Sequence, residues 1–468
     1  MKLPELLLPA GDKEKAYVAF RYGADAIYMG MPMFSLRTRM NTVTESDIEE
    51  IVNFAREHNK KVYIVINGFP HQNMMEILTK HMKRLEEIKP HGLIIADPGV
   101  LSLANEYAPS LEKHLSVQSS TVNVPAMKFW QNNNICRVIL AREIAIEEVV
   151  KIHNALPGME LEYFVHGAVC MAYSGRCILS NFMSARDSNR GACSHTCRWN
   201  YRVFDDGGNE IDVSDRVDKR ADAALEPKGK SCCDTKPVDK PCCGSGGKAK
   251  SIHDFESKKY LEEELRPNEF IPVEEDFHGT HMMSSRDMCM IEHLQKVIDA
   301  GVISLKVEGR NKTIYYLATV TRAYRQALDN IADGKPFDEK LWEEIHATAN
   351  RGFFAGFLHG KPQIGDQQYE SGGSESTHHF VGKVLSAKDG KITFDVRNRL
   401  NIGDEIEFIF PDMKDDIKVT ITKMEKGGSE VTALHGGNGE GSIFSDIEIP
   451  EGILMRKKMT EERTETYG

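Results

Sequence analysis

The sequence predicts an α/β protein: a TIM-type (β/α)8 barrel with a long insertion after strand 7, followed by a small C-terminal antiparallel β-barrel domain. Three observations lead to this prediction. Short apolar runs alternate with helical patterns through the first 167 residues, and an eighth such unit follows much later, at 302–334. From about Phe380 the pattern changes to strand-like alternation between Gly and Asp turns.

The predicted barrel strands are separated by amphipathic segments. Segments such as 44–58 and 71–88 carry apolar residues at helical spacing, as expected of crossover helices between parallel strands. A doubly wound open sheet is the competing architecture. The GxGxxG turn that would favour it is missing after the first strand, and eight units fit a closed barrel. The predicted strands cover residues 5–11, 24–30, 61–67, 91–97, 114–120, 137–142, 161–167 and 302–310.

A long insertion separates the last two predicted strands. About 135 residues lie between Gly167 and Leu305, where a helix and two loops need far fewer. Part of this insertion is rich in Lys, Pro, Gly and Asp and nearly free of large apolar residues, which is typical of a mobile loop. The predicted boundaries are 1–335 for the barrel, 168–300 for the insertion, 216–250 for the loop, 336–375 for a connecting segment and 376–468 for the β domain.

Composition limits the classes of function. A net charge of -11 and a pI near 5.9 exclude a protein that coats nucleic acid with its whole surface, so any such site is a local patch. The N-terminal apolar run is interrupted by Pro9, Gly11 and Asp12, and it offers neither a signal-peptide core nor a membrane span. We therefore expect a soluble, cytoplasmic protein.

Four cysteines after the seventh predicted strand carry the strongest chemical signal. Cys170, Cys177, Cys193 and Cys197 are separated by six, fifteen and three residues, unlike the short knuckles of structural zinc sites. Thiolates at irregular spacing suit an iron–sulfur cluster, and zinc or unliganded thiols are the alternatives. Loops after barrel strands form the catalytic face, so the cluster would lie at the active end.

The remaining cysteines are less informative. Cys289 precedes the last barrel strand and competes with Cys197 for the fourth ligand position, although a buried small residue explains it equally well. Cys136 precedes strand six at the opposite barrel end, where we expect it to be structural. The pairs at 232–233 and 242–243 lie in the predicted mobile loop, where a soft-metal site and an oxidation-prone surface are both open.

A basic segment overlaps the cysteines. Five arginines stand against one acid, Asp187, so residues 176–202 have a local net charge of +4. Arginines beside an aromatic side chain can hold phosphates while the ring stacks on an unpaired base, although a solvated loop remains the alternative. The predicted RNA-binding residues are Arg176, Arg186, Arg190, Arg198, Trp199 and Arg202.

Polar residues at the predicted strand ends should point near the barrel mouth. His166 and Glu308 are candidate catalytic groups, and Arg310 is a candidate catalytic group or a clamp for a carboxylate or phosphate. Arg142 is a candidate for binding a cosubstrate. Such residues also cap loops, so a structural role stays open for each. Further candidates at strand ends are Asn67, Asp97, Gln118 and Glu143.

The segment FVHGAVCMAYSGRCILSNF at 164–182 resembles the signature of peptidase family U32, the collagenase-like peptidases. The resemblance extends to ELLLPAGDKEKAYVAFRYGADAIYMG, GACSHTCRWNYRV, SSRDMC, SLKVEGRNKTIYYLATVTRAYRQAL and the terminal β domain. It is strongest to the branch that hydroxylates tRNA. The cysteine pairs at 232–233 and 242–243 depart from the family pattern.

This resemblance implies a barrel with a [4Fe-4S] cluster and prephenate-dependent conversion of wobble uridine in tRNA to 5-hydroxyuridine. Cys170, Cys177 and Cys193 are the ligands that it carries over, with the fourth left between Cys197 and Cys289. The implied partners are tRNA and a small dicarboxylate cosubstrate, for which charge and position make Arg142 or Arg310 the candidates.

Two other functions stay open at this point. A peptidase is the first alternative, and a cysteine nucleophile such as Cys170 with His166 is its only visible route, because no Ser/His/Asp or HExxH pattern stands out. Four clustered cysteines are more readily ligated than left as one nucleophile. The second alternative is a non-enzymatic RNA-binding or assembly factor.

Overall fold

The computed structural model describes residues 3–31, 34–35, 43–68, 70–169, 286–309, 312–360, 374–437 and 439–459, and the backbone of short strands within 172–285 and at 367–368. The chain forms two compact units. The first holds residues 1–178, 286–366 and 373–468, and the second holds 179–285 with 367–372. All described residues of the barrel and of the C-terminal domain belong to the first unit.

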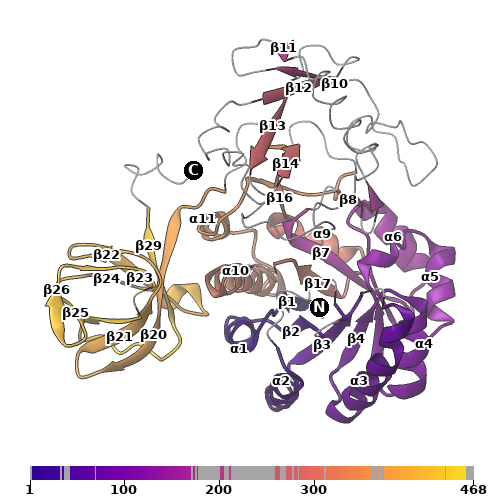
Figure 1. Ribbon diagram of the computed structural model, residues 1–468, viewed down its shortest axis with the longest axis horizontal. Helices are drawn as coiled ribbons and strands as arrows, with labels where there is room; N and C mark the ends of the chain where they lie inside the picture. Colours follow the sequence, from indigo (N-terminus) through magenta and orange to yellow (C-terminus); the bar gives the residue numbers. More distant parts are fainter. Residues whose placement is uncertain are drawn as a thin grey trace, which may run out of the picture. The chain divides into compact units, whose positions relative to one another are not determined.

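Eight parallel strands close into a barrel, as predicted from the sequence (Figure 1). Neighbouring strands pair in sequence order, and the eighth barrel strand closes the circle by pairing with both the first and the seventh. The barrel strands are β1 (Glu5–Pro9), β2 (Ala26–Gly30), β3 (Lys61–Ile66), β4 (Gly92–Ile95), β5 (Glu112–Leu115), β6 (Arg137–Ile139), β7 (Glu160–Ala168) and β17 (Ser304–Val307).

Helices follow the strands and cover the outside of the barrel (Figure 1). Most begin at a side-chain cap that accepts an orphan backbone N–H. Thr44 and Asp47 form a capping box, and Thr313 caps the longest helix. The helices are α1 (Lys13–Arg21), α2 (Glu45–Glu57), α3 (Met75–Ile88), α4 (Pro98–Tyr107), α5 (Val124–Gln131), α6 (Ile146–Ala155), α9 (Leu294–Asp299) and α10 (Ile314–Ala332).

One predicted strand lies earlier in the sequence than the apolar pattern indicated. The structure ends β5 at Leu115, whereas we expected a strand at 114–120. Ser116 accepts a hydrogen bond from the backbone N–H of Gln118 and starts a 3-10 turn over Val117–Ser119. A serine side chain that bonds the local backbone competes with the sheet ladder, which explains the early end.

Two short strands extend the barrel sheet beside β7. Strand β16 (Asp287–Cys289) pairs antiparallel with the end of β7, and β18 (Phe353–Phe354) pairs parallel with β16. The second unit contains an antiparallel sheet of five strands among its described residues, in the order β11 (Glu210–Ile211), β10 (Tyr201–Phe204), β12 (Lys259–Glu263), β13 (Phe270–Asp276) and β14 (Gly279–Met282). The predicted loop at 216–250 lies outside the described residues.

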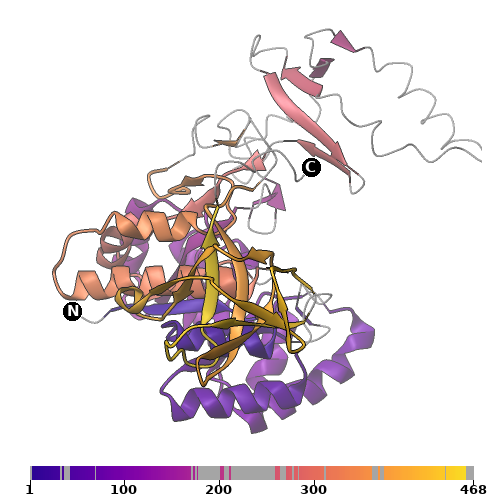
Figure 2. The ribbon, with the colours of Figure 1, turned by 90° about the vertical axis from the view of Figure 1, so that its left-hand side faces the viewer.

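The C-terminal domain is antiparallel, as predicted. Its eight-stranded sheet forms a half-barrel, which faces the viewer in Figure 2. Alternating residues such as Phe394 and Phe408 fill a core separate from that of the barrel. The sheet order is β24 (Ile417–Thr420), β23 (Glu405–Ile409), β29 (Leu454–Lys458), β20 (His378–Lys388), β21 (Lys391–Val396), β28 (Glu440–Phe444), β25 (Met424–Lys426) and β26 (Ser429–Val431).

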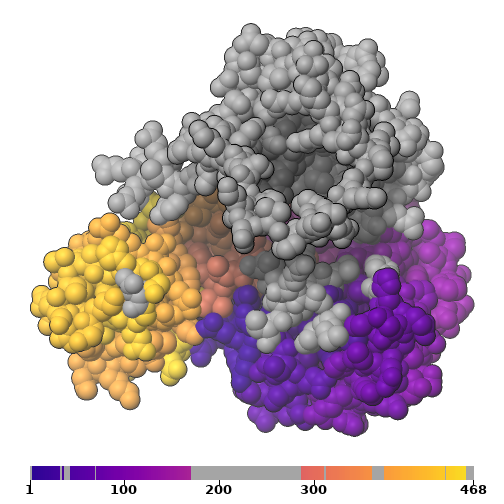
Figure 3. Space-filling model, in the orientation of Figure 1, coloured from indigo at the N-terminus to yellow at the C-terminus, as the bar shows by residue number. Residues whose placement is uncertain are grey.

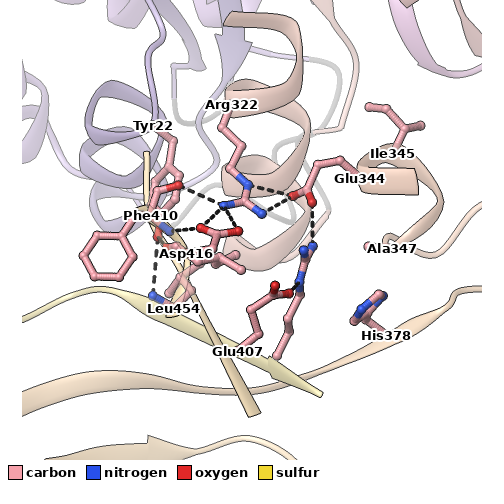
Figure 4. Close-up of polar contacts among 12 residues, drawn as sticks. Tyr22, Arg322, Glu344, Ile345, Ala347, His378, Glu407, Phe410, Asp416 and Leu454 are labelled. Carbon is pink, nitrogen blue, oxygen red and sulfur yellow. Dashed lines mark hydrogen bonds and ion pairs between the residues drawn. The ribbon is translucent and has the colours of Figure 1, made fainter. Parts of the chain in front are cut away.

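Buried charges join this domain to the barrel (Figure 4). Arg322 of α10 donates to Glu344 of α11 (Lys340–His346) at 2.7 Å and to Asp416 of the C-terminal domain at 2.7 Å. Arg456 of β29 donates to the second oxygen of Glu344 at 2.8 Å and to Glu407 at 2.6 Å. Burial opposes the charged form of Glu344, but the two guanidinium groups hold the pKa of its carboxyl below the usual value. Each buried charge therefore has a partner from the other domain or a neighbouring helix.

Hydrogen bonds extend this contact to the first helix of the barrel. The Tyr22 hydroxyl donates to the carbonyl of Ile409 at 2.8 Å, and the Arg21 guanidinium donates to the carbonyl of Glu451 at 2.7 Å. In the space-filling view, the orange and yellow C-terminal domain touches the surface of the barrel (Figure 3). The C-terminal domain and the barrel are thus fixed against each other by polar contacts that are mostly buried.

Candidate functional site at the barrel mouth

Charged side chains fill the barrel interior near the amino-terminal ends of the strands. Glu162 of β7 is fully buried and accepts from Lys306 at 2.6 Å and from Arg137 at 3.4 Å. Burial raises the pKa of the Glu162 carboxyl, but Lys306 and Arg137 outweigh it and hold the pKa below the usual value. Arg137 also donates to Glu5 and Glu160, both at 2.9 Å. These charges compensate one another, and Glu5, Arg137 and Glu160 also line a cavity of about 610 Å³ at this end of the strands.

Aromatic rings lie above this network. The Lys306 ammonium is 4.1 Å from the ring centroid of Tyr28 and 5.7 Å from that of Phe164. The Arg142 guanidinium carbon lies 3.7 Å from the centroid of the same Phe164 ring. Cation–π contacts of this kind fix the plane of a guanidinium without using its N–H donors.

The mouth holds an ion pair formed by two predicted residues. Arg142 follows β6 and Glu308 follows β17, and their side chains meet at 3.3 Å between Nη2 and Oε2. Among the described residues, the Arg142 Nε has no hydrogen-bond partner, although it is buried. Gly167 permits the approach: it has φ +109, and a Cβ there would lie 2.7 Å from the Glu308 carbonyl oxygen. Only glycine fits this position without strain.

Amides line another part of the mouth. Asn67 after β3 donates to the side-chain oxygen of Gln118 at 2.5 Å, and the Ser116 hydroxyl donates to the same oxygen at 3.2 Å. Asp97 instead caps α4 by accepting from the Val100 N–H at 3.0 Å. Asn67 and Gln118 therefore belong to the polar rim, whereas Asp97 serves the helix that follows it.

His166 lies away from this constellation. Its ring is 1% exposed and packs beside Tyr316, Tyr324 and Phe353, with Nδ1 3.2 Å from the Tyr324 hydroxyl. Burial lowers its pKa to about 3, so the imidazole is neutral at ordinary pH. A bulge between Lys306 and Val307 pairs His166 with Val307, which belongs to the outward-facing row of β17. This placement favours a packing role, and we do not include His166 in the constellation.

Cys289 occupies the same outer layer. It pairs with His166 across β16 and β7, is 2% exposed, and places its Sγ 3.6 Å from the Tyr324 hydroxyl. Burial raises the pKa of the thiol to about 12, so the sulfur stays protonated.

The other predicted site residues stay predictions. Cys177 and Arg176 fall in β9 (Arg176–Cys177) and Arg202 in β10, for which the structure describes the backbone only. Outside the described residues lie Cys170, Cys193, Cys197, Arg186, Arg190, Arg198, Trp199 and Arg310.

Sequence reasoning missed Phe164, the ring on which Arg142 stacks. Its signal was the period of β7, since Glu162 and Phe164 alternate with apolar Tyr163 and Val165 and so face the barrel interior. Because most residues of β7 are apolar, this alternation is hard to recognise in the sequence. The charged residues inside the barrel, Arg137 and Lys306, were missed for the same reason.

A closed (β/α)8 barrel with an arginine–glutamate pair and an amide rim at the carboxyl ends of its strands belongs to the class of barrel proteins whose chemistry takes place at the mouth. The family model described as "Peptidase family U32" matches residues 11–368, and the one described as "Peptidase family U32 C-terminal domain" matches residues 376–456. The chain belongs to peptidase family U32.

Several curated proteins match over nearly the whole chain. The tRNA hydroxylation protein P of Escherichia coli is 38% identical over 99% of this chain and 99% of its own length. The tRNA hydroxylation protein P1 of Bacillus subtilis is 34% identical over 97% of this chain and 95% of its own. A relative named collagenase, from Porphyromonas gingivalis, is 27% identical over 87% of this chain and 86% of its own.

The described helices also bear on membrane association. None of them combines the length and the apolar character that crossing a bilayer requires.

Proposed function

We propose that this protein is a cytoplasmic enzyme that hydroxylates the wobble uridine of tRNA to 5-hydroxyuridine, using an iron–sulfur cluster and a prephenate-like dicarboxylate. The observation that carries the proposal is the 38% identity over 99% of both chains to a tRNA hydroxylation protein. The Arg142–Glu308 pair at the mouth supports it, because it supplies a cation where a small carboxylate would bind.

The proposed cluster is [4Fe-4S], held by Cys170, Cys177, Cys193 and Cys197. The donor set fits, since four thiolates are the usual ligands of such a cluster. In sequence, Cys170 follows the end of β7 by two residues, and the end of β7 is at the same barrel end as Glu308. We assign the fourth position to Cys197 rather than Cys289, because the Cys289 side chain is buried in the layer beside His166 and Tyr324. When bound, the cluster supplies electrons or a Lewis-acidic iron.

Arg142 is the proposed cosubstrate clamp. Phe164 holds one face of the guanidinium, and Glu308 takes one N–H of Nη2. The remaining N–H groups, that of Nε among them, would donate to a carboxylate of the cosubstrate. Glu308 would act as a positioning residue that keeps the guanidinium in register. Arg310 is a second candidate for the other carboxylate of the cosubstrate.

The proposed RNA contacts come from the basic segment. Arg176, Arg186, Arg190, Arg198 and Arg202 would neutralise phosphates, while Trp199 would stack on an unpaired base. A local patch of this kind is compatible with the acidic net charge of the whole chain.

Nucleoside mass spectrometry of tRNA tests the proposal. Protein purified without oxygen is incubated with unmodified tRNA and prephenate, and iron and sulfide are measured in the same sample. We expect 5-hydroxyuridine, and its loss in a Cys170→Ala variant that still binds tRNA. Iron-free protein with intact activity would overturn the cluster, and tRNA binding without any modification would favour the non-enzymatic alternative.

The peptidase alternative rests on the relative named collagenase. Its predicted pair is Cys170 with His166; Cys170 lies outside the described residues, and the His166 side chain is 1% exposed. Burial lowers the pKa of His166 to about 3, and its Nδ1 lies 3.2 Å from the Tyr324 hydroxyl, so this histidine is poorly placed as a base for a peptide substrate. Cleavage of a collagen peptide by metal-free protein would reinstate this alternative.

A further inference from the structure

Three residues with metal-binding side chains meet at the barrel end opposite the mouth. Glu112 and His114 lie on β5, and Cys136 immediately precedes β6. One ligand atom from each residue lies within 4.8 Å of the other two. These residues stand at the amino-terminal ends of their strands, whereas Arg142 and Glu308 follow the carboxyl ends. The cluster is therefore separate from the site proposed for RNA modification.

The distance within the cluster suits a small divalent cation. His114 Nε2 lies 3.2 Å from Glu112 Oε2. Zinc bonds nitrogen and oxygen at about 2.0–2.2 Å, so two such ligands in a tetrahedron stand about 3.3 Å apart. The sulfur of Cys136 would complete the set after a small side-chain rotation. Carboxylate, imidazole and thiolate together are typical ligands of zinc.

The imidazole is buried and incompletely satisfied. The His114 side chain has no exposed surface, and its Nδ1 has no hydrogen-bond partner among the described residues. The ring packs against Tyr63 at 4.7 Å between centroids. The nitrogen that faces Glu112 is Nε2, so zinc would replace the present Nε2–Glu112 hydrogen bond and the ring proton would stand on Nδ1.

The charged side chains near this cluster neither prevent zinc from binding nor supply another cation in its place. Cys136 donates its S–H to the carbonyl of Lys113 at 3.5 Å, and burial raises the pKa of the thiol. Zinc would displace that proton. The nearby cation Arg137 is already paired with Glu5, Glu160 and Glu162. A thiolate and a carboxylate would then balance the two charges of zinc.

We propose that Glu112, His114 and Cys136 form a zinc site that ties β5 to β6 at the amino-terminal end of the barrel, with water as the fourth ligand. The same trio does not form a catalytic triad, because the thiol bonds a backbone carbonyl rather than the imidazole. At this end of a (β/α)8 barrel a bound ion stabilises the fold and takes no part in the reaction at the mouth.

Zinc-dependent protection of one thiol tests the site in the unmodified full-length protein. Cys136 is half-buried, and iodoacetamide can label it in protein kept free of zinc. Zinc at ten times its dissociation constant should slow alkylation of the peptide that contains Cys136 by about tenfold, because about a tenth of the sites stay unoccupied. Peptide mass spectrometry separates this thiol from the other nine. An alkylation rate unaffected by zinc would overturn the proposal.

A set of variants provides the second measurement. Cys136→Ser and Glu112→Gln should each bind one zinc fewer per chain than wild type by metal analysis, and should lose the thermal stabilisation that zinc gives. Glu106→Gln removes an exposed carboxylate from the preceding helix and serves as the matched control. Equal zinc content in wild type and Cys136→Ser would refute the site. Hydroxylation of tRNA should be unchanged in Cys136→Ser, so the two proposals fail independently.

Discussion

The guanidinium of Arg142 lies 3.3 Å from the carboxylate of Glu308, although 166 positions separate them in the sequence. Barrel closure creates this contact, because β17 pairs with β7, which in turn pairs with β6. The ion pair sits over the ring of Phe164 and is only slightly exposed. Among the described residues of the mouth, this pair is the one that we propose holds a carboxylate of the cosubstrate.

Replacing Arg142 with methionine should lower kcat/KM for the dicarboxylate by about 10- to 100-fold, since a hydrogen bond to a charged group contributes roughly 1.5–3 kcal/mol. Methionine keeps apolar contact with Phe164, so the fold should survive. Lys151→Met removes an exposed cation from α6 and is the matched control. Steady-state kinetics with varied prephenate measure the effect. Equal loss in both variants would argue against a specific clamp.

Cys289 and Cys170 should differ in their effect on iron content. Because the Cys289 side chain is buried against Tyr324, Cys289→Ala should retain the full iron and sulfide of wild type. Cys170→Ala should lose most of both. Iron and sulfide analysis of protein purified without oxygen measures this. Loss of iron in Cys289→Ala alone would return the fourth ligand position to Cys289.

Breaking the buried charge network between the barrel and the C-terminal domain should be costly. Glu344→Gln leaves Arg322 and Arg456 without a common anionic partner, so the free energy of unfolding should fall by about 3–5 kcal/mol. Glu339→Gln, at an exposed position just before the same helix, should have little effect. Denaturant unfolding followed by circular dichroism compares the two. Similar small losses in both variants would show that the network contributes little.

Acid should destabilise the protein partly through His166. Burial lowers its pKa from an ordinary value near 6.5 to about 3, so between these values the unfolded chain binds a proton that the folded chain does not. The stability from this residue is complete above about pH 6.5 and is lost as the pH falls toward 3. Each pH unit in this window should cost about 1.4 kcal/mol.

A variant that lacks the His166 imidazole isolates the contribution of this residue to the pH dependence of stability. His166→Gln should show a shallower fall of unfolding free energy between pH 6 and pH 4 than wild type, whatever its stability at pH 7. His71→Gln removes an exposed histidine and should follow the wild-type slope. Denaturant titrations at several pH values provide the slopes. Parallel curves for wild type and His166→Gln would contradict the assignment.

The sequence alone was sufficient for the barrel and for part of its mouth. Apolar runs of six to nine residues, separated by amphipathic helical patterns, predict the parallel barrel, and the change of pattern after Phe380 marks the antiparallel domain. Position at the end of a strand was enough to select Arg142 and Glu308. Local sequence also determined the family, through the segment around Cys170 and the match over residues 11–368.

Tertiary structure decided which of these side chains meet. His166 and Glu308 both stand at strand ends, yet a bulge beside Lys306 turns His166 outward under α10. Folding buried Cys289 against Tyr324, a choice that the sequence left open, and brought Cys136 beside His114, a contact that the sequence did not predict. The physical reason is that facing direction and desolvation depend on strand register and on the helix packed above it. Neither is present in the local sequence, which specifies a residue's chemistry but not its neighbours.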